Sequence, residues 1–262
     1  MCRHAPLRFT VCPTGAGHSL GALVEGSGIV SSIRSFQELA YVDDPAWPGL
    51  RDLLNSSSVP TTVLPPSADQ ARNTLFRLQV TARSMLGALA LNTGGLLVDH
   101  GWLRVLGGGC DGLPDLASVN RLGEPGQQAQ PPSALVVAID VLGGRFAVNG
   151  GTLPAEPGEV CYFGSDTLEW SAIGGGHSAF VQWALGGGMA EFYDALRWPG
   201  WEEEVVALTP GQGLSVYPPL WSAEGRGDVA GTSRRSATLT ELVAVHIDSA
   251  AQLGLTPGGE SG

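Results

Sequence analysis

Lysine is absent from this chain of 262 residues, and all 14 of its basic residues are arginines. A P-loop and a pyridoxal Schiff base both need a lysine, so enzymes of these two classes are excluded. The chain also lacks an apolar run of about 18 residues, which a membrane-spanning helix would need. Metal-binding motifs such as C-x-x-C and H-E-x-x-H are missing, and His100, His177 and His246 could meet only through folding. We therefore expect no metal site and no cofactor.

Charged residues are scarce at 15% of the chain, yet the net charge is −11. Nine acids lie within 156–204, against Arg197 as the one basic residue there. A negative surface disfavours nucleic acid and anionic membranes as partners and permits a basic protein partner. The alternative interpretation of this stretch is a solvated acidic face. The four cysteines are widely spaced, which favours reduced thiols and a cytoplasmic location over a disulfide framework.

The first thirty residues lack helical or strand periodicity after Val11, and we expect 1–30 to be a disordered leader. Within this leader, residues 17–21 (GHSLG) match the G-x-S-x-G nucleophile elbow of hydrolases. The elbow needs a helix directly after it, and the following glycines would stop such a helix, so the leader is the favoured interpretation. A single compact domain over 32–253 and a loose tail over 254–262 complete the predicted organisation.

Periodicity and turn signals predict an α+β fold, in which an antiparallel strand meander has helices before and after it. Capping boxes at Ser35, Ser67 and Thr238 mark the starts of three helices. Glycine-rich turns separate the strands of the meander over 134–173. Outside it we expect strands at 61–64, 84–91 and 214–217, helices at 178–185, 189–196 and 201–208, and a loop from 218 to 235.

The stretch 94–109 (GGLLVDHGWLRVLGGG) holds two short apolar runs, which predict two buried strands or one bent strand. The chain's only adjacent acid and histidine, Asp99 and His100, lie between these runs beside Trp102. Asp99 could orient His100 as a general base, with Cys110 as the nucleophile of a small hydrolase-like enzyme. Two alternatives stay open: a histidine held by hydrogen bonds at a strand end, and a small-molecule site around Trp102.

The most unusual patch is 197–204, which is RWPGWEEE. Two tryptophans and an arginine around a Pro-Gly turn have the composition of a protein-binding hot spot. The alternative is that both tryptophans belong to the core and the glutamates to a solvated first helical turn. Segment 217–221 (YPPLW) fits a docking loop or a packed corner equally well. The predicted binding residues are Trp102, Arg197, Trp198, Trp201, Glu202, Glu203 and Glu204.

Six segments together resemble one bacterial family that is known only as a domain of unknown function. The resemblance covers roughly 32–253 and implies no activity. The segments are DPAWP (44–48), 94–109, GGRFAVNGG (143–151), YFGSDTLEW (162–170), RWPGWEEE (197–204) and YPPLWSAEG (217–225).

A weaker similarity is to the SUKH superfamily, α+β domains many of which are immunity proteins against secreted nuclease toxins. It rests on the order of elements and on a GGxFAxN-like element that includes Gly144, Phe146 and Ala147. This second resemblance implies an immunity-like role and assigns no residue a function.

These observations favour a non-enzymatic protein-binding module with an acidic, tryptophan-rich recognition surface. The hydrolase-like enzyme and the small-molecule binding domain remain the alternatives. Neither the identity of a partner nor the oligomeric state follows from the sequence.

Overall fold

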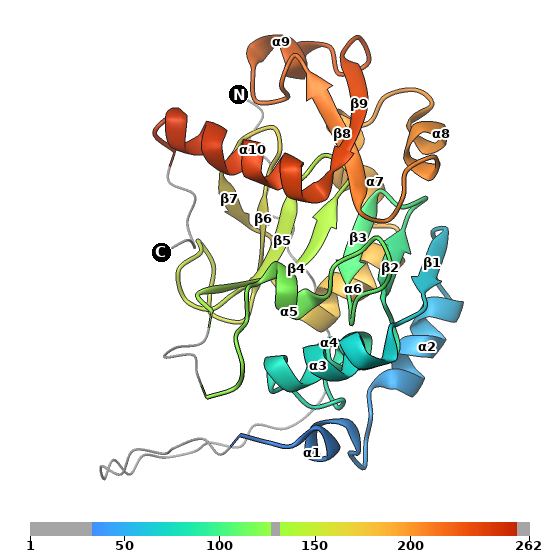
Figure 1. Cartoon of the computed structure of the whole chain (residues 1–262). Helices are drawn as coiled ribbons and strands as arrows, with labels where there is room; N and C mark the ends of the chain where they lie inside the picture. Colours follow the sequence, from blue (N-terminus) through green and yellow to red (C-terminus); the bar gives the residue numbers. More distant parts are fainter. Residues whose placement is uncertain (1–32, 127–131, 256–262) are drawn as a thin grey trace.

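The computed structural model describes residues 33–126 and 132–255, and it has a mixed α+β fold (Figure 1). The predicted leader, with its G-x-S-x-G motif, and all but the first two residues of the tail lie outside the described residues. Seven strands form one sheet in sequential order, and every neighbouring pair is antiparallel. These strands are β1 (Thr61–Leu64), β2 (Gly95–Val98), β3 (Leu103–Leu106), β4 (Ala134–Asp140), β5 (Arg145–Asn149), β6 (Val160–Phe163) and β7 (Trp170–Ala172).

A separate two-stranded ribbon, β8 (Gln212–Tyr217) with β9 (Ser233–Thr238), follows the meander. Helices flank the meander on both sides in the chain, as the sequence predicts. They are α1 (Phe36–Ala40), α2 (Trp47–Asn55), α3 (Ala68–Leu78), α4 (Met85–Asn92), α5 (Leu116–Val119), α6 (His177–Leu185), α7 (Met189–Phe192), the 3-10 turn η1 (Asp194–Leu196), α8 (Trp201–Val206), α9 (Ala223–Gly227) and α10 (Leu239–Gln252).

Local capping explains where several helices start. The predicted capping boxes at Ser35 and Thr238 are both formed, because each side chain and its partner glutamate satisfy one another's amides. The helix predicted after Ser67 is present, although the Ser67 side chain makes no capping bond. Among the described residues, no helix has both the length and the apolar character that crossing a bilayer requires.

Two sequence predictions are wrong. Segment 84–91 is helix α4 and not a strand: Ser84 caps it by accepting from the amide of Gly87. This helix is apolar on nearly all sides, so it shows no helical period that would distinguish it from a strand. The predicted loop to residue 235 contains α9 and the start of β9. Strand β9 (SRRSAT) was missed because it is mostly polar and exposed.

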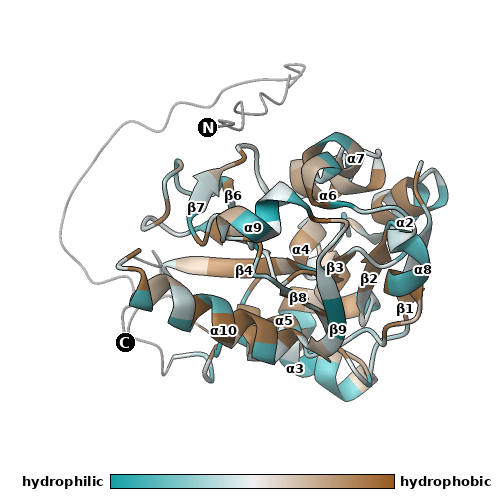
Figure 2. Cartoon of the chain, turned by 90° about the horizontal axis from the view of Figure 1, so that it is seen from above, coloured by the Kyte–Doolittle hydropathy of each residue, from teal (hydrophilic) through white to brown (hydrophobic). Residues whose placement is uncertain are grey.

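The large sheet is covered on both faces by helices (Figure 2). On one face, the ring centre of Phe146 in β5 lies 4.8 Å from that of Phe180 in α6 and 5.8 Å from that of Phe192 in α7. On the other face, Phe163 of β6 packs in a cluster with Ala250 of α10. Helix α10 therefore joins the small ribbon to the large sheet.

A fully buried carboxylate, Asp140, fixes the turn between β4 and β5. Its Oδ1 accepts from the amides of Leu142 and Gly144, and its Oδ2 accepts from the hydroxyls of Tyr162 (2.8 Å) and Tyr193 (3.0 Å). Burial raises the pKa of Asp140 in spite of these four donors. Position 144 must be glycine, since a Cβ there would lie 2.3 Å from Oδ2. This cluster ties the segment after α7 to the sheet.

Candidate functional site

The turn between β2 and β3 has an unusual backbone. Asp99 (φ 54°), His100 (φ 59°) and Gly101 (φ 88°) are consecutive residues with left-handed conformation. Aspartate and histidine tolerate this region better than most residues, but each still costs about 1 kcal/mol or more. The amide of Trp102 closes the turn by donating to the Asp99 carbonyl at 2.9 Å. The interpretation of 94–109 as two strands is confirmed, and its polar centre is the hairpin turn.

Packing brings the two unusual sequence segments together at this turn. Arg197 forms an ion pair with the Asp99 carboxylate, across 98 residues of sequence. Its guanidinium carbon lies 4.1 Å from the ring centre of Trp201 and 4.8 Å from that of Trp102. The Trp102 ring is fully buried, and its centre lies 5.0 Å from that of Trp201 and 5.8 Å from that of Trp198. We call these five residues the tryptophan cluster.

Glu204 and Arg234 pack against the tryptophan cluster at Trp198. The Trp198 indole donates to Glu204 Oε1 at 2.8 Å, and Arg234 stacks 4.3 Å from the Trp198 ring centre. Arg234 Nε also pairs with Glu204 Oε2 at 3.0 Å. Hydrogen bonds from Arg234, joined by the one from Trp198, lower the pKa of the Glu204 carboxyl. These three residues therefore hold one another in place.

The predicted binding residues thus divide into two groups. Trp102 and Trp198 are buried and offer no face to a partner. Trp201 is half-buried, while Glu202 and Glu203 are exposed in the first turn of α8. Of the residues predicted to form a binding hot spot, Trp201, Glu202 and Glu203 therefore remain accessible to a partner.

The acids of 156–204 do not gather in one patch. Four of them, at 156, 159, 166 and 169, lie around β6 and β7, whereas Glu202–Glu204 lie on α8. These elements are at opposite ends of the large sheet (Figure 1). An acidic recognition surface would therefore be limited to the region of α8.

The residues of the predicted hydrolase do not converge. His100 is exposed, and its ring meets that of Trp201 edge-on, with the two ring centres 5.8 Å apart. The His100 side chain makes no hydrogen bond to any described residue. The expected hydrogen bond of a histidine at a strand end is therefore also not formed. Cys110 packs against Gly94, at the other end of β2 from Asp99. Five residues of extended chain span about 16 Å, so Cys110 is too far away to act with His100.

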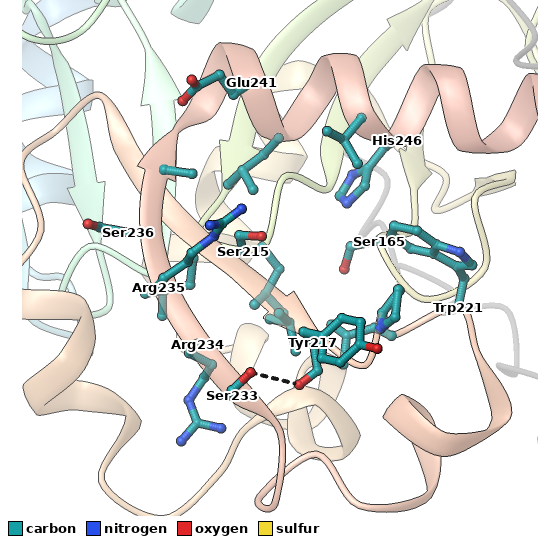
Figure 3. Close-up of a pocket in the computed structure, with 18 residues that line it drawn as sticks. Ser165, Ser215, Tyr217, Trp221, Ser233, Arg234, Arg235, Ser236, Glu241 and His246 are labelled. Atoms are coloured by element: carbon teal, nitrogen blue, oxygen red, sulfur yellow. Dashed lines mark hydrogen bonds between the residues drawn. The ribbon is translucent and has the colours of Figure 1, made fainter.

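A pocket of about 1010 Å³ lies elsewhere, between the β8–β9 ribbon, α10 and segment 217–221 (Figure 3). Its wall is mixed: it includes the apolar side chains of Leu142, Leu242, Val245 and Trp221, and also serines, arginines, a glutamate and a histidine. Val245 is exposed although it is apolar. A concave, largely apolar site with a few polar groups is the usual form of a ligand-binding pocket.

Two polar groups of the pocket wall have unused hydrogen-bonding capacity. Ser165 Oγ is buried and has no hydrogen-bond partner among the described residues. His246 Nδ1 lies 3.4 Å from the Gly143 carbonyl; because a carbonyl only accepts, Nδ1 carries the proton and Nε2 is left as an acceptor. The His246 ring meets Trp221 edge-on at 5.4 Å. Burial lowers the pKa of His246 to about 4, so the imidazole is neutral at pH 7.

The third polar group is Arg235, which comes from the ribbon. In the antiparallel register, Arg235 faces Ser215, and Val216 faces Arg234. Because successive side chains of a strand alternate between its faces, Arg235 points over the pocket and Arg234 points away from it (Figure 3). Arg235 is exposed and forms no ion pair with a described residue.

Sequence reasoning missed this pocket, although two signals pointed near it. Segment 217–221 supplies Trp221, and the segment 162–170 supplies Ser165. Both belong to stretches singled out for their family resemblance. His246 was considered only as a metal ligand, and the described residues contain no cluster of three His, Cys, Asp or Glu side chains that could hold a metal.

Comparison with known proteins places the chain in a family. Residues 36–242 match the family model described as a protein of unknown function, DUF2625, and the chain belongs to this family. This confirms the resemblance to a bacterial family of unknown function. The match gives no support to the similarity with the SUKH superfamily.

Two relatives come from well-known bacteria. An uncharacterised protein of Escherichia coli (strain K12), YbfG, is 39% identical over 217 residues, which cover 80% of this chain and 94% of the relative. An uncharacterised protein of Haemophilus influenzae (strain Rd) is 32% identical over 189 residues, covering 72% of this chain and 83% of the relative. No solved structure matches the chain.

Proposed function

We propose, from the premise that this chain is a DUF2625 protein of unassigned activity, that it is a binding protein whose ligand occupies the pocket beside β8, β9 and α10. The hydroxyl of Ser165 carries this proposal, because it is buried at the pocket wall without a hydrogen-bond partner. A buried hydroxyl without a partner costs about 1–3 kcal/mol, and a ligand atom that bonds to it would offset this cost.

Binding is favoured over catalysis by the absence of an activated nucleophile in the pocket. No hydrogen bond joins Ser165 to His246 among the described contacts, and His246 is oriented by a backbone carbonyl instead of a carboxylate. Nucleophilic catalysis needs the base within hydrogen-bond reach of the nucleophile. With Asp99, His100 and Cys110 also dispersed, the triad predicted from the sequence is not assembled either.

The test is a screen by protein NMR, in which small organic molecules of negative, neutral and positive charge are added to the full chain. We expect binders to shift the amides of Ser165, Ser215 and Val245. Ser215→Tyr should place a phenol ring in the pocket beside Arg235 and abolish these shifts, whereas Thr240→Tyr, on an exposed position of α10 outside the pocket, should leave them intact. Binders that shift only amides elsewhere, or that ignore Ser215→Tyr, would contradict the proposal.

A second candidate function is recognition of a basic protein at the start of α8. Exposed Glu202 and Glu203 lie beside half-buried Trp201 and exposed His100, so acids and aromatic surface are adjacent there. The immunity-like role rested on the SUKH similarity and has no further support. A cytoplasmic location, which suits either candidate, is supported by the free thiols of Cys110 and Cys161.

This second candidate predicts how a basic partner, captured from the bacterial lysate, should bind. Reversal of Glu202 and Glu203 to lysine should slow association several-fold, as should added salt, because rim charges steer encounter. Trp201→Ala should instead speed dissociation. Reversal of the exposed Glu156 and Glu169 to lysine, an equal change of charge at the far end of the sheet, is the control. A partner whose association rate ignores both the reversal and the salt would exclude this surface.

A further inference from the structure

We propose that the pocket binds an organic monocarboxylate, with Arg235 holding the carboxylate and the apolar walls enclosing the rest of the molecule. This inference rests on the proposed function, since it specifies the chemistry of the same site.

The charged side chains of the pocket wall indicate the charge of the ligand. Arg235 forms no direct ion pair with a described residue, although its charge, after the hydrogen bonds from Thr238, helps to lower the pKa of the nearby Glu241 carboxyl. The two other charged side chains of the pocket wall have hydrogen-bond or ion-pair partners of their own. Glu241 Oε2 accepts from the amide (2.9 Å) and the hydroxyl (2.8 Å) of Thr238 in the capping box of α10. Arg234 is paired with Glu204 on the opposite face of the ribbon. In a chain of net charge −11, the guanidinium of Arg235 is thus a cation of the pocket wall without a direct ion pair to a described residue.

The geometry of an arginine selects the anion. A guanidinium is a planar fork of N–H donors that matches a carboxylate with two parallel hydrogen bonds. Ser215, its cross-strand partner, supplies a hydroxyl directly beside it. A phosphate dianion would usually gather several cations, and Arg235 is the one cation among the described residues on this face of the ribbon. A carboxylate is therefore the better match.

The remaining pocket wall selects the body of the ligand. Leu242 and Val245 of α10 and Trp221 of segment 217–221 give the pocket wall apolar surface, which favours an apolar or aromatic group. Beside Trp221 lie His246 and the unpartnered Ser165 hydroxyl (Figure 3). The Ser165 hydroxyl and His246 Nε2 can bond to a hydroxyl or amine of the ligand. The imidazole is neutral, so this end offers no charge to a second carboxylate. The pocket wall therefore favours a ligand with a single carboxylate on an apolar body.

A matched series of probes tests this assignment on the full chain. The probes are 3-(4-hydroxyphenyl)propanoate, the corresponding alcohol, the corresponding amine, and phenyl phosphate. Binding is measured by calorimetry and located by the NMR shifts of the pocket amides. We expect the carboxylate to bind most tightly, and Arg235→Gln to weaken it about tenfold or more, to the affinity of the alcohol. Arg226→Gln, an exposed arginine on α9 outside the pocket, should change nothing.

The other outcomes separate the two proposals. If the amine, the alcohol or the phosphate binds at the pocket as tightly as the carboxylate, or if Arg235→Gln has no effect, the carboxylate assignment is overturned and the pocket proposal stands. If no probe, and no compound of the mixed-charge screen, shifts the pocket amides, both are overturned. Circular dichroism confirms that Arg235→Gln is folded, and Arg235→Lys should retain part of the affinity.

Discussion

The tryptophan cluster and the pocket lie on opposite faces of the same strand, β9, and they differ in how their polar groups are used. Arg234 faces the cluster and is fully engaged by Glu204 and the Trp198 ring. Arg235, the next residue, faces the pocket and has no ion pair with a described residue. In the cluster two buried atoms lack hydrogen bonds, Trp102 Nε1 and Arg197 Nε, but aromatic rings cover both side chains. In the pocket, the unpartnered Ser165 Oγ is buried at the wall, whereas Arg235 is exposed.

This difference shows that the most conspicuous segment of a sequence can owe its composition to packing in the core. Tryptophans bury large areas and stack with arginine, so a tryptophan-rich segment has a strong reason to be core. Residues of a pocket need only meet in space, and here they come from positions between 142 and 246 without forming a linear motif. The comparison gives four predictions, of decreasing size.

The largest contrast is between two tryptophans. Trp102→Ala should lower the free energy of unfolding by about 3–5 kcal/mol, because its fully buried ring packs against two other indoles. Trp221→Ala, at a half-buried ring of the pocket wall, should cost less and should abolish ligand binding. Urea denaturation measures the first effect and NMR titration the second. The reverse order of stabilities would contradict the division into a structural cluster and a binding pocket.

Acid should destabilise the protein through two histidines. Burial lowers the pKa of both His177 and His246 to about 4, from about 6.5 in the unfolded chain. The unfolded state therefore binds protons first: stability is complete above pH 6.5 and is lost as the pH falls toward 4. Between pH 7 and pH 5 the expected loss is about 2 kcal/mol for each histidine.

His246→Gln tests which part of the acid effect comes from the pocket. The variant should remove about half of the pH dependence in urea titrations at pH 5 to 7, with His177→Gln as the matched variant outside the pocket. Arg145, whose charge further lowers the pKa of His246, is unchanged in both variants. Equal slopes in the wild type and both variants would show that other groups dominate.

The two arginines that face the two sites should behave differently. Arg197→Gln leaves the Asp99 carboxylate without its partner and should cost about 2 kcal/mol, since both side chains are mostly buried. Arg235→Gln should change stability by less than about 0.5 kcal/mol. A double-mutant cycle of Arg197→Gln with Asp99→Asn isolates the pairing from other effects. A coupling near zero would mean that ring packing, and not the ion pair, holds Arg197.

The smallest effect should appear at the turn of the β2–β3 hairpin. His100→Gly relieves the left-handed conformation and should be neutral or stabilising by about 0.5 kcal/mol, whereas His100→Val should be destabilising. Thermal denaturation of the wild type and the two His100 variants measures the order of their stabilities. If His100→Gly is instead strongly destabilising, the edge contact with Trp201 matters more than the backbone.

The sequence predicts the meander well, because alternation and glycine turns are local properties of 134–173. It fails at α4, where uniform apolarity hides the helical period, and at β9, whose polar residues do not alternate with apolar ones. Within the candidate sites, both members of the Asp99–Arg197 pair were identified, but not their contact across 98 residues. The pocket was beyond reach for the same reason, since Ser165, Arg235 and His246 become neighbours only when α10 and the ribbon pack on the sheet.

Because Arg234 and Arg235 are adjacent, the pairing register between β8 and β9 decides which arginine faces the tryptophan cluster and which faces the pocket. A slip of β9 by one residue would exchange the faces of the two arginines. Arg234 would then face the pocket side of the ribbon, and Arg235 the side of Trp198. An insertion or deletion of a single residue within β9, before Arg234, would therefore change the packing around Trp198 and the lining of the pocket together. In relatives, such changes should be rarer within β9 than its polar, exposed sequence suggests.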